Sequence, residues 1–231
     1  MADIRLKIEL LYTDPLVWRR VVVPEKINLL RLHEVIQAIM GWEEAHLFEF
    51  ECNGRYYGLP DEWSDRPIAL ARNAQLKAIA ARAEENTFYY RYDFGDDWLH
   101  RITIEATDLV ETSPCPRLLE AERACPPEDI GGTLGYEALL EAAAGQPNEH
   151  GKMLLEMLGG EFNPDDVDTD EVAAMLEPIQ RGFKRNKVKR KPLPASDQEA
   201  WPIDMTRSLK DQGIDDMDTL IAIVEQYKQR R

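Results

Sequence analysis

The segment from Tyr92 to His100 constrains the fold most, because it predicts a β-hairpin turn between two strands rich in large apolar side chains. Side chains alternate between the two faces of a strand, so the pairing register decides which of them share a face. A three-residue loop over 95–97, with Gly95 supplying a positive φ, puts every large apolar group on one face. This register pairs Phe94 with Trp98 and Tyr92 with His100, and it turns Asp93 to the other face. The predicted core face carries Phe88, Tyr90, Tyr92, Phe94, Trp98, His100, Ile102 and Ile104.

The N-terminal part of the chain is predicted to supply further strands. Apolar and polar residues alternate over 4–10 and 46–52, and a second strand spans 17–23, closed by Pro24. The pair Asn53-Gly54 predicts another hairpin. These stretches indicate a mainly antiparallel sheet.

Helices are predicted mostly after the strands. Asn28 and Gly41 bound an early helix as its N-terminal cap and its stop. Because one helix is inserted among strands and the others follow them, the pattern favours an α+β fold with helices packed on one face of the sheet. The remaining stretches of helical character are 68–83, 117–124, 136–144, 149–158 and 168–182.

Charge divides the chain unevenly. The net charge of −15 argues against nonspecific nucleic-acid binding by the whole surface, yet residues 178–196 contain seven basic residues and no acidic one. This basic stretch is interpreted as a solvated linker, with a nucleic-acid or phosphate contact as the alternative. The residues that would make such a contact are Lys184, Arg185, Lys187, Lys189, Arg190 and Lys191.

Beyond the basic stretch, apolar residues from Met217 to Tyr227 recur at helical spacing and predict an amphipathic last helix. It is expected to pack on the same chain, with an oligomer or partner contact as the alternative. The predicted organisation is therefore an α+β domain over 1–183, a basic Pro-containing linker over 184–200, and a C-terminal helical extension over 201–231.

Composition also bears on the compartment. No apolar run approaches the length of a membrane span, and the N-terminus has no signal-peptide pattern, so no membrane partner is expected. The three cysteines, an odd number without a CxxC pair, are expected to be reduced thiols in a cytoplasmic protein.

The chain carries a series of motifs in this order: Leu6–Leu10, Pro15–Arg20, Leu32–Gln37, Gly41-Trp42, His46–Phe50, Tyr92–His100, and Cys125–Asp129 with Gly131, Gly132, Gly135 and Tyr136. Together these motifs resemble the plasmid pRiA4b ORF-3-like family over roughly residues 3 to 183. The resemblance implies an α/β-roll arrangement within the α+β class. It implies no established activity, although some family members are labelled as transposon passenger or resolvase-like proteins, which suggests an association with mobile genetic elements.

Three histidines in these motifs, at 33, 46 and 100, could bind a metal together with Asp96, Asp97 or Cys52, since imidazole, carboxylate and thiolate are common ligands. No compact spacing such as HxH or HExxH supports this, so no residue is assigned as a metal ligand and no cofactor is required. The alternative is histidines bonded to the backbone or to neighbouring side chains. The candidate ligand-binding residues are His33, His46, Tyr92, Asp96, Asp97, Trp98 and His100.

Two function classes follow. The favoured one is a noncatalytic binding or accessory protein, because no assembled catalytic constellation is visible in the sequence. The alternative is a metal-dependent hydrolase or nuclease that uses Asp96, Asp97 and His100, since such enzymes need clustered acids.

Overall fold

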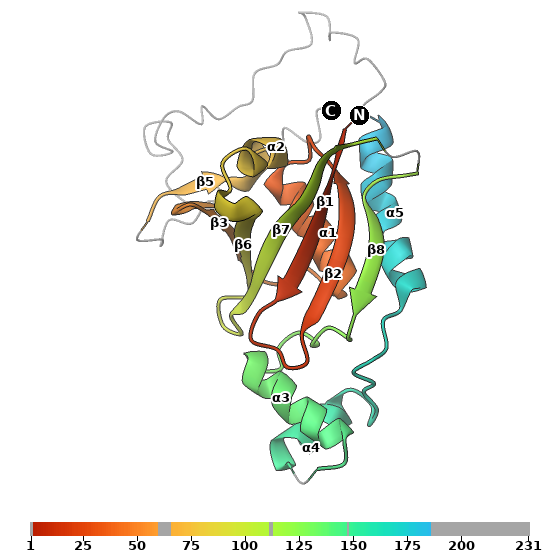
Figure 1. The fold of residues 1–231 in the computed structure, drawn as a ribbon. Coiled ribbons are helices and arrows are strands. Elements are labelled where there is room, and N and C mark those ends of the chain that lie inside the picture. Colours follow the sequence, from red (N-terminus) through yellow and green to blue (C-terminus); the bar gives the residue numbers. More distant parts are fainter. Residues whose placement is uncertain (1, 60–65, 111–112, 147, 186–231) are drawn as a thin grey trace, which may run out of the picture. The chain divides into compact units, whose positions relative to one another are not determined.

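An eight-stranded sheet in the order β5-β4-β3-β6-β7-β1-β2-β8 organises the chain (Figure 1). Its neighbouring strands are antiparallel except for the parallel pair β4 and β5. The strands are β1 (Asp3–Leu10), β2 (Val17–Pro24), β3 (Phe48–Cys52), β4 (Arg55–Gly58), β5 (Ile68–Leu70), β6 (Thr87–Tyr92), β7 (Trp98–Leu109) and β8 (Arg117–Glu122).

This computed structural model describes residues 2–59, 66–110, 113–146 and 148–185. The predicted C-terminal extension and all of the basic linker beyond Arg185 lie outside the described residues. The helices are α1 (Leu29–Met40), α2 (Leu76–Ala80), α3 (Gly132–Ala143), α4 (Glu149–Met157) and α5 (Thr169–Arg185).

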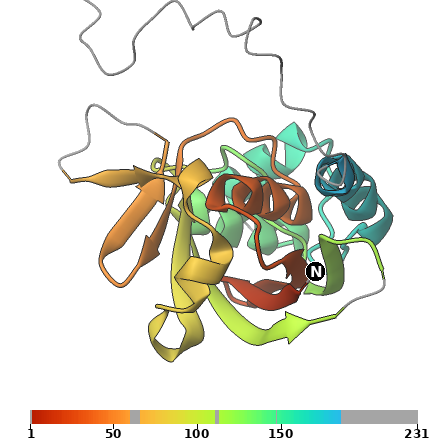
Figure 2. The ribbon, with the colours of Figure 1, turned by 90° about the horizontal axis from the view of Figure 1, so that it is seen from above.

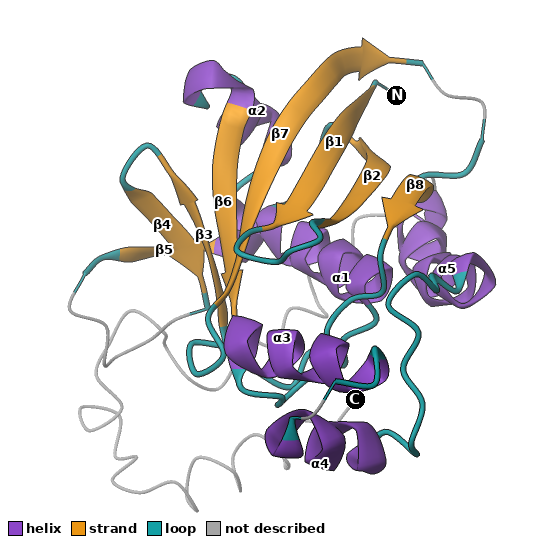
Figure 3. Ribbon diagram, turned by 60° about the horizontal axis from the view of Figure 1, so that its bottom comes forward, coloured by secondary structure: helices purple, strands orange, loops and turns teal. Residues whose placement is uncertain are grey.

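Helix α1 lies against one face of the curved sheet, as Figures 2 and 3 show. The side chain of Asn28 accepts a hydrogen bond from the Arg31 amide at 2.9 Å, and Gly41 ends the helix with φ 84°. Both predicted caps are therefore confirmed. Helix α5 packs against α1 and β8. The apolar face of α1 and the inward side chains of the central strands form the core, which includes Leu6, Ile8, Leu32, Ile36, Phe50, Tyr90 and Trp98.

Helices α3 and α4 pack against each other at the end of the sheet where β6 turns into β7 (Figures 1 and 3). The side chain of Asp96, at the tip of this turn, accepts a hydrogen bond from the Gly131 amide at 3.2 Å. The turn therefore contacts the start of α3, which begins at Gly132, earlier than the predicted 136.

The predicted register of the β6–β7 hairpin is wrong, although most of its face assignment is right. Tyr92 pairs with Trp98 and Tyr90 with His100, so the loop has five residues, 93–97. The reason is local: Asp93 and Asp97 both have positive φ, and the Asp97 amide donates to the Asp93 carbonyl at 2.7 Å, which closes the longer turn. Because the pairing register is shifted by two residues, the side chains within both strands stay on their predicted faces. Phe94, however, lies in the loop and not in the core, and it is 46% exposed.

The helix predicted over 117–124 is also wrong, because residues 117–122 form strand β8. This strand pairs with β2, where Trp18 lies opposite Glu122 and Val22 opposite Arg117. The backbone groups at the free edge of β2 need hydrogen-bond partners, and residues 117–122 supply them. This tertiary pairing overrides the weak helical preference of residues 117–124. The region 68–83 likewise divides into strand β5, short helical turns and α2.

The α+β class predicted from the sequence is confirmed, with a mainly antiparallel sheet and helices packed on it. Within the described residues, no helix combines the length and the apolar character needed to cross a lipid bilayer.

Candidate functional site

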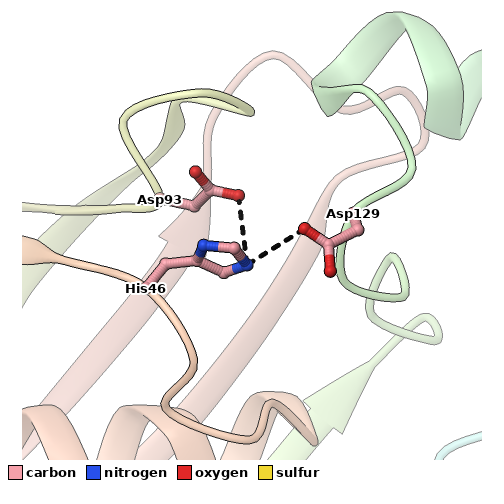
Figure 4. A group of neighbouring side chains, drawn as sticks. All are labelled: His46, Asp93 and Asp129. Carbon is pink, nitrogen blue, oxygen red and sulfur yellow. Dashed lines mark ion pairs between the residues drawn. The ribbon is translucent and has the colours of Figure 1, made fainter.

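Three segments that are distant in sequence meet beside the β6–β7 turn and bring His46, Asp93 and Asp129 together (Figure 4). His46 lies in the connection between α1 and β3. The sequence predicts a strand from residue 46, but β3 begins only at Phe48. Asp93 follows the last residue of β6, and Asp129 lies between β8 and α3. The cluster therefore depends on the tertiary fold.

The three side chains present their donor atoms to one another. His46 Nε2 lies 3.0 Å from Asp129 Oδ1 and 3.7 Å from Asp93 Oδ2. One donor atom from each residue lies within 4.8 Å of the other two. The Asp93 side chain is 11% exposed and that of Asp129 is 73% exposed, so the cluster is closed on one side and open to solvent on the other.

His46 Nε2 is shielded from solvent and has no hydrogen-bond partner of acceptable geometry among the described residues, in spite of its short distance to Asp129. A neutral imidazole that turned its lone pair toward two carboxylates would be repelled by them. The Nε2 atom must therefore either carry the ring proton, as one neutral tautomer does, or face a bound cation.

The hydroxyl of Tyr92 fixes the loops that carry these groups. It accepts hydrogen bonds from the amides of Ala45 at 3.1 Å and His46 at 3.3 Å, and it donates to the Glu128 carboxylate. Burial, reinforced by the Glu128 charge, raises the pKa of Tyr92, so the hydroxyl keeps its proton. Since Tyr92 directly precedes Asp93, this residue connects all three segments of the cluster.

Asp93 itself has two separate roles. Its Oδ1 atom accepts a hydrogen bond from the Gly95 amide at 2.9 Å, while its Oδ2 atom faces His46. The turn thus holds the carboxylate in one orientation, which is what a pre-formed ligand site requires.

Among the other candidate residues predicted from the sequence, His33 is buried and packs within the protein core. Its Nδ1 lies 2.7 Å from the Tyr90 hydroxyl, and its ring stacks on Phe48 with the centroids 3.7 Å apart. Burial lowers the pKa of His33 to about 3. The side chain is therefore a neutral member of the core.

His100 and Trp98 also lie in the core. His100 has no exposed surface, its Nδ1 lies 3.0 Å from the Trp98 carbonyl oxygen, and burial lowers its pKa to about 4. The Trp98 ring stacks on Trp42 with the centroids 6.0 Å apart. Neither side chain is open to an external ligand in this conformation.

The loop carboxylates point to different partners. Asp97 lies 3.1 Å from Arg91 Nε, whereas Asp96 accepts from the Gly131 amide. Cys52, the thiol considered as a ligand, is buried at the far end of β3, and burial raises its pKa. The structure thus brings His46 and Tyr92 to the cluster but leaves the other candidates outside it.

The basic candidate residues lie at the end of α5 and beyond it in the sequence. Lys184 and Arg185 lie in the last turn of α5. Lys187, Lys189, Arg190 and Lys191 lie outside the described residues, so the nucleic-acid contact stays a prediction.

The sequence pattern does not identify Asp93 and Asp129 as partners of His46. Strand alternation predicts that Asp93 faces away from the core, but β6 ends at Tyr92, so the alternation does not apply to Asp93. Both residues adopt positive φ, at 52° and 58°. Aspartate tolerates this conformation better than most residues. An aspartate directly after an aromatic strand was the available signal.

The chain matches the family model of the plasmid pRiA4b ORF-3-like protein over residues 2–171. A relative described as uncharacterized protein y4hQ of Sinorhizobium fredii is 44% identical over 179 residues, which cover 77% of this chain and 89% of the relative. The crystal structure of a protein of unknown function, MM3350 from Methanosarcina mazei Go1, superposes with a TM-score of 0.66 at 32% identity, covering 74% of this chain and 97% of that one.

Proposed function

This chain belongs to the plasmid pRiA4b ORF-3-like family, and from that premise we propose that it is a noncatalytic binding protein that holds a divalent cation at His46, Asp93 and Asp129. The family carries no established activity, so the proposal rests on the geometry of this cluster.

The observation that carries the proposal is the convergence of one imidazole nitrogen and two carboxylates, with the shielded Nε2 atom left without a hydrogen-bond partner among the described residues. Bonds of about 2.1 Å to nitrogen and oxygen put neighbouring octahedral ligands about 3.0 Å apart and opposite ligands about 4.2 Å apart. The distances of 3.0 and 3.7 Å from His46 Nε2 fall in this range. One imidazole and two carboxylates suit Zn²⁺, Mn²⁺ or Fe²⁺.

The alternative of a hydrolase built on Asp96, Asp97 and His100 is not favoured by the geometry. His100 has no exposed surface and Asp97 pairs with Arg91. A general base must reach the proton that it removes, and the imidazole of His100 does not reach solvent.

Metal titration of the full chain tests the proposal. The protein is stripped with a chelator, and binding of Zn²⁺, Mn²⁺, Mg²⁺ and Ca²⁺ is measured by calorimetry and by the shift in melting temperature. We expect one saturable transition-metal site. The variants His46→Gln and Asp129→Asn should each weaken binding by at least about tenfold, or 1.4 kcal/mol.

Matched variants make the test specific. Asp97→Asn removes a second exposed aspartate with positive φ, and His150→Gln removes an exposed histidine, both outside the cluster. These controls should bind the metal like the unmodified protein. Absence of saturable binding, or equal losses in the controls, would overturn the proposal.

The same preparations, incubated with nucleic acids and phosphoesters with and without metal, test the noncatalytic part. No turnover is expected. Turnover that Asp97→Asn abolishes would instead establish the hydrolase alternative.

We also propose a cytoplasmic location and a nucleic-acid partner. A cytoplasmic location agrees with the three free cysteines, since the cytoplasm keeps thiols reduced. An association with mobile elements, and nucleic-acid contact through the basic linker, are proposed on the family's plasmid origin and on the charge of residues 184–191. Salt-sensitive DNA binding that is lost when Lys187, Lys189, Arg190 and Lys191 are changed to Gln would support the contact.

A further inference from the structure

A hollow of about 540 Å³ lies where β4 and β5 begin, at the end of β3 remote from the His46 cluster. Among the residues that the structure describes, its lining includes the guanidinium-bearing residues Arg55, Arg66 and Arg82 and no carboxylate residue. This composition is unusual in a chain with a net charge of −15.

Two of the three arginines are available to form an ion pair with a bound anion. Arg66 pairs with the buried carboxylate of Glu49, which neutralises it. Arg55 and Arg82 make no ion pair with any residue in the described part of the chain. Within the described part of the chain, the hollow therefore retains two positive charges that no carboxylate neutralises.

The backbone brings these two arginines together. Asn53 and Gly54 form the β3–β4 turn with φ of 51° and 72°. The Asn53 side-chain amide then donates to the Arg82 carbonyl oxygen at 2.7 Å. This bond holds the segment after α2 against the turn that precedes Arg55.

The rest of the hollow is aromatic and apolar. The Arg66 guanidinium stacks on the Tyr56 ring at 3.6 Å from its centroid, and Tyr57, Pro67 and Ile68 continue the wall. Such a surface accepts the face of a planar ring. The volume lies within the range of about 300–1,000 Å³ that is usual for small-ligand pockets.

From this arrangement we propose that the hollow binds a small phosphorylated aromatic molecule of the mononucleotide class. Arg55 and Arg82 hold the phosphate through charge-assisted hydrogen bonds, and the ring lies on the tyrosine and apolar wall. Glu51, Glu84 and Glu85 line a neighbouring hollow. Their charges repel a long polyanion, which favours a small anion over a nucleic-acid strand.

Calorimetry on the full chain at low salt tests the proposal with three probes: AMP, adenosine and inorganic phosphate. We expect AMP to bind at least about tenfold more tightly than either fragment, since it alone uses both halves of the hollow. The variants Arg55→Gln and Arg82→Gln should each weaken AMP binding by about tenfold, the effect of losing one charge-assisted contact.

Arg72→Gln is the matched control, because Arg72 is exposed and does not line the hollow. It should leave AMP binding unchanged, and melting temperatures should show that all three variants are folded. Failure of AMP to saturate at millimolar concentration, or equal binding of adenosine and AMP, would sink the proposal. AMP binding that persists in His46→Gln separates this site from the proposed cation site.

Discussion

The Nδ1 atom of His33 lies 2.7 Å from the hydroxyl of Tyr90, across 57 residues of sequence. The side chain of Gln37 donates to the same hydroxyl at 3.0 Å. In the His33 tautomer that carries its proton on Nε2, the tyrosine hydroxyl donates to Nδ1 while it accepts from Gln37. Burial raises the pKa of Tyr90 and lowers that of His33, so both groups stay uncharged in the core.

The two buried histidines, His33 and His100, predict that acid begins to destabilise the protein at a pH well above the pKa values of its carboxylates. The folded pKa is about 3 for His33 and about 4 for His100, against an ordinary value of 6.5. Below pH 6.5 the unfolded chain takes up protons that the folded chain does not bind. The contribution of each neutral histidine to the free energy of unfolding is therefore fully present above that pH and decreases below it. Between pH 4.5 and 6 each histidine contributes a slope of up to about 1.4 kcal/mol per pH unit.

Urea unfolding at several pH values measures this slope. His33→Gln and His100→Gln should each reduce it, because glutamine does not titrate. His150→Gln, at an exposed histidine, should leave it unchanged. A slope that is the same in all four proteins would show that neither core histidine resists protonation.

The fold could be predicted where local pattern and tertiary packing agree. The faces of β6 and β7 and the caps of α1 follow from alternation and capping chemistry that a few neighbouring residues determine. Strand β8 could not be recognised in this way, because its conformation depends on the free edge of β2, which lies about a hundred residues earlier in the chain.

The candidate site was only partly predictable for the same reason. His46 and Tyr92 lie in recognisable motifs, but the partners of His46 are decided by the closure of the β6–β7 turn and the path of the chain before α3. A positive φ at Asp93 reverses the face that alternation assigns to it. Histidine spacing along the sequence carries no information about such a contact.

Tyr92→Phe is predicted to weaken both the fold and the proposed cation site. The variant keeps the ring that stacks on Trp42 with the centroids 5.0 Å apart, but it loses the hydroxyl that joins the His46 amide to Glu128. Loss of a buried hydrogen-bonding group costs about 1–3 kcal/mol. Metal affinity should fall about 10- to 100-fold, as for other residues that orient ligands.

Tyr89→Phe is the control for this change, because Tyr89 is partly exposed on the opposite face of β6. Urea unfolding and metal titration should show little effect there. If Tyr92→Phe retained full metal affinity, the hydroxyl would have no part in positioning the cluster.

Gly135→Ala is predicted to destabilise the protein because α3 passes very close to the preceding chain. A Cβ atom at Gly135 would lie 1.7 Å from the Ile130 carbonyl oxygen, so the backbone must shift. We expect a loss of about 2–3 kcal/mol, the upper part of the range for overpacked sites.

Gly182 provides the matched comparison, since it lies in α5 with no atom within 4 Å of an added Cβ. Gly182→Ala should be neutral or stabilise by about 0.5–1 kcal/mol through helix propensity. Thermal and urea unfolding of the two variants should therefore move in opposite directions. A neutral Gly135→Ala variant would contradict the close approach of α3.

Arg19→Met is predicted to be the most destabilising of these changes. Arg19 is 2% exposed, and its guanidinium donates to the carbonyl of Ile39 at 2.8 Å and to those of Glu122 and Arg123 at 3.1 and 2.9 Å. It thereby joins the end of α1 to the end of β8. Methionine fills similar volume but leaves these buried acceptors without a donor.

We expect Arg19→Met to cost about 3–5 kcal/mol in urea unfolding, the loss typical of breaking a buried charged network. Arg19→Lys should recover only part of this loss, because a single ammonium group cannot reproduce the planar fork that reaches both segments. Arg31→Met, at an exposed arginine paired with Glu34, should cost under about 0.5 kcal/mol. A small effect at Arg19, similar to that at Arg31, would mean that α1 and β8 stay joined through apolar packing alone.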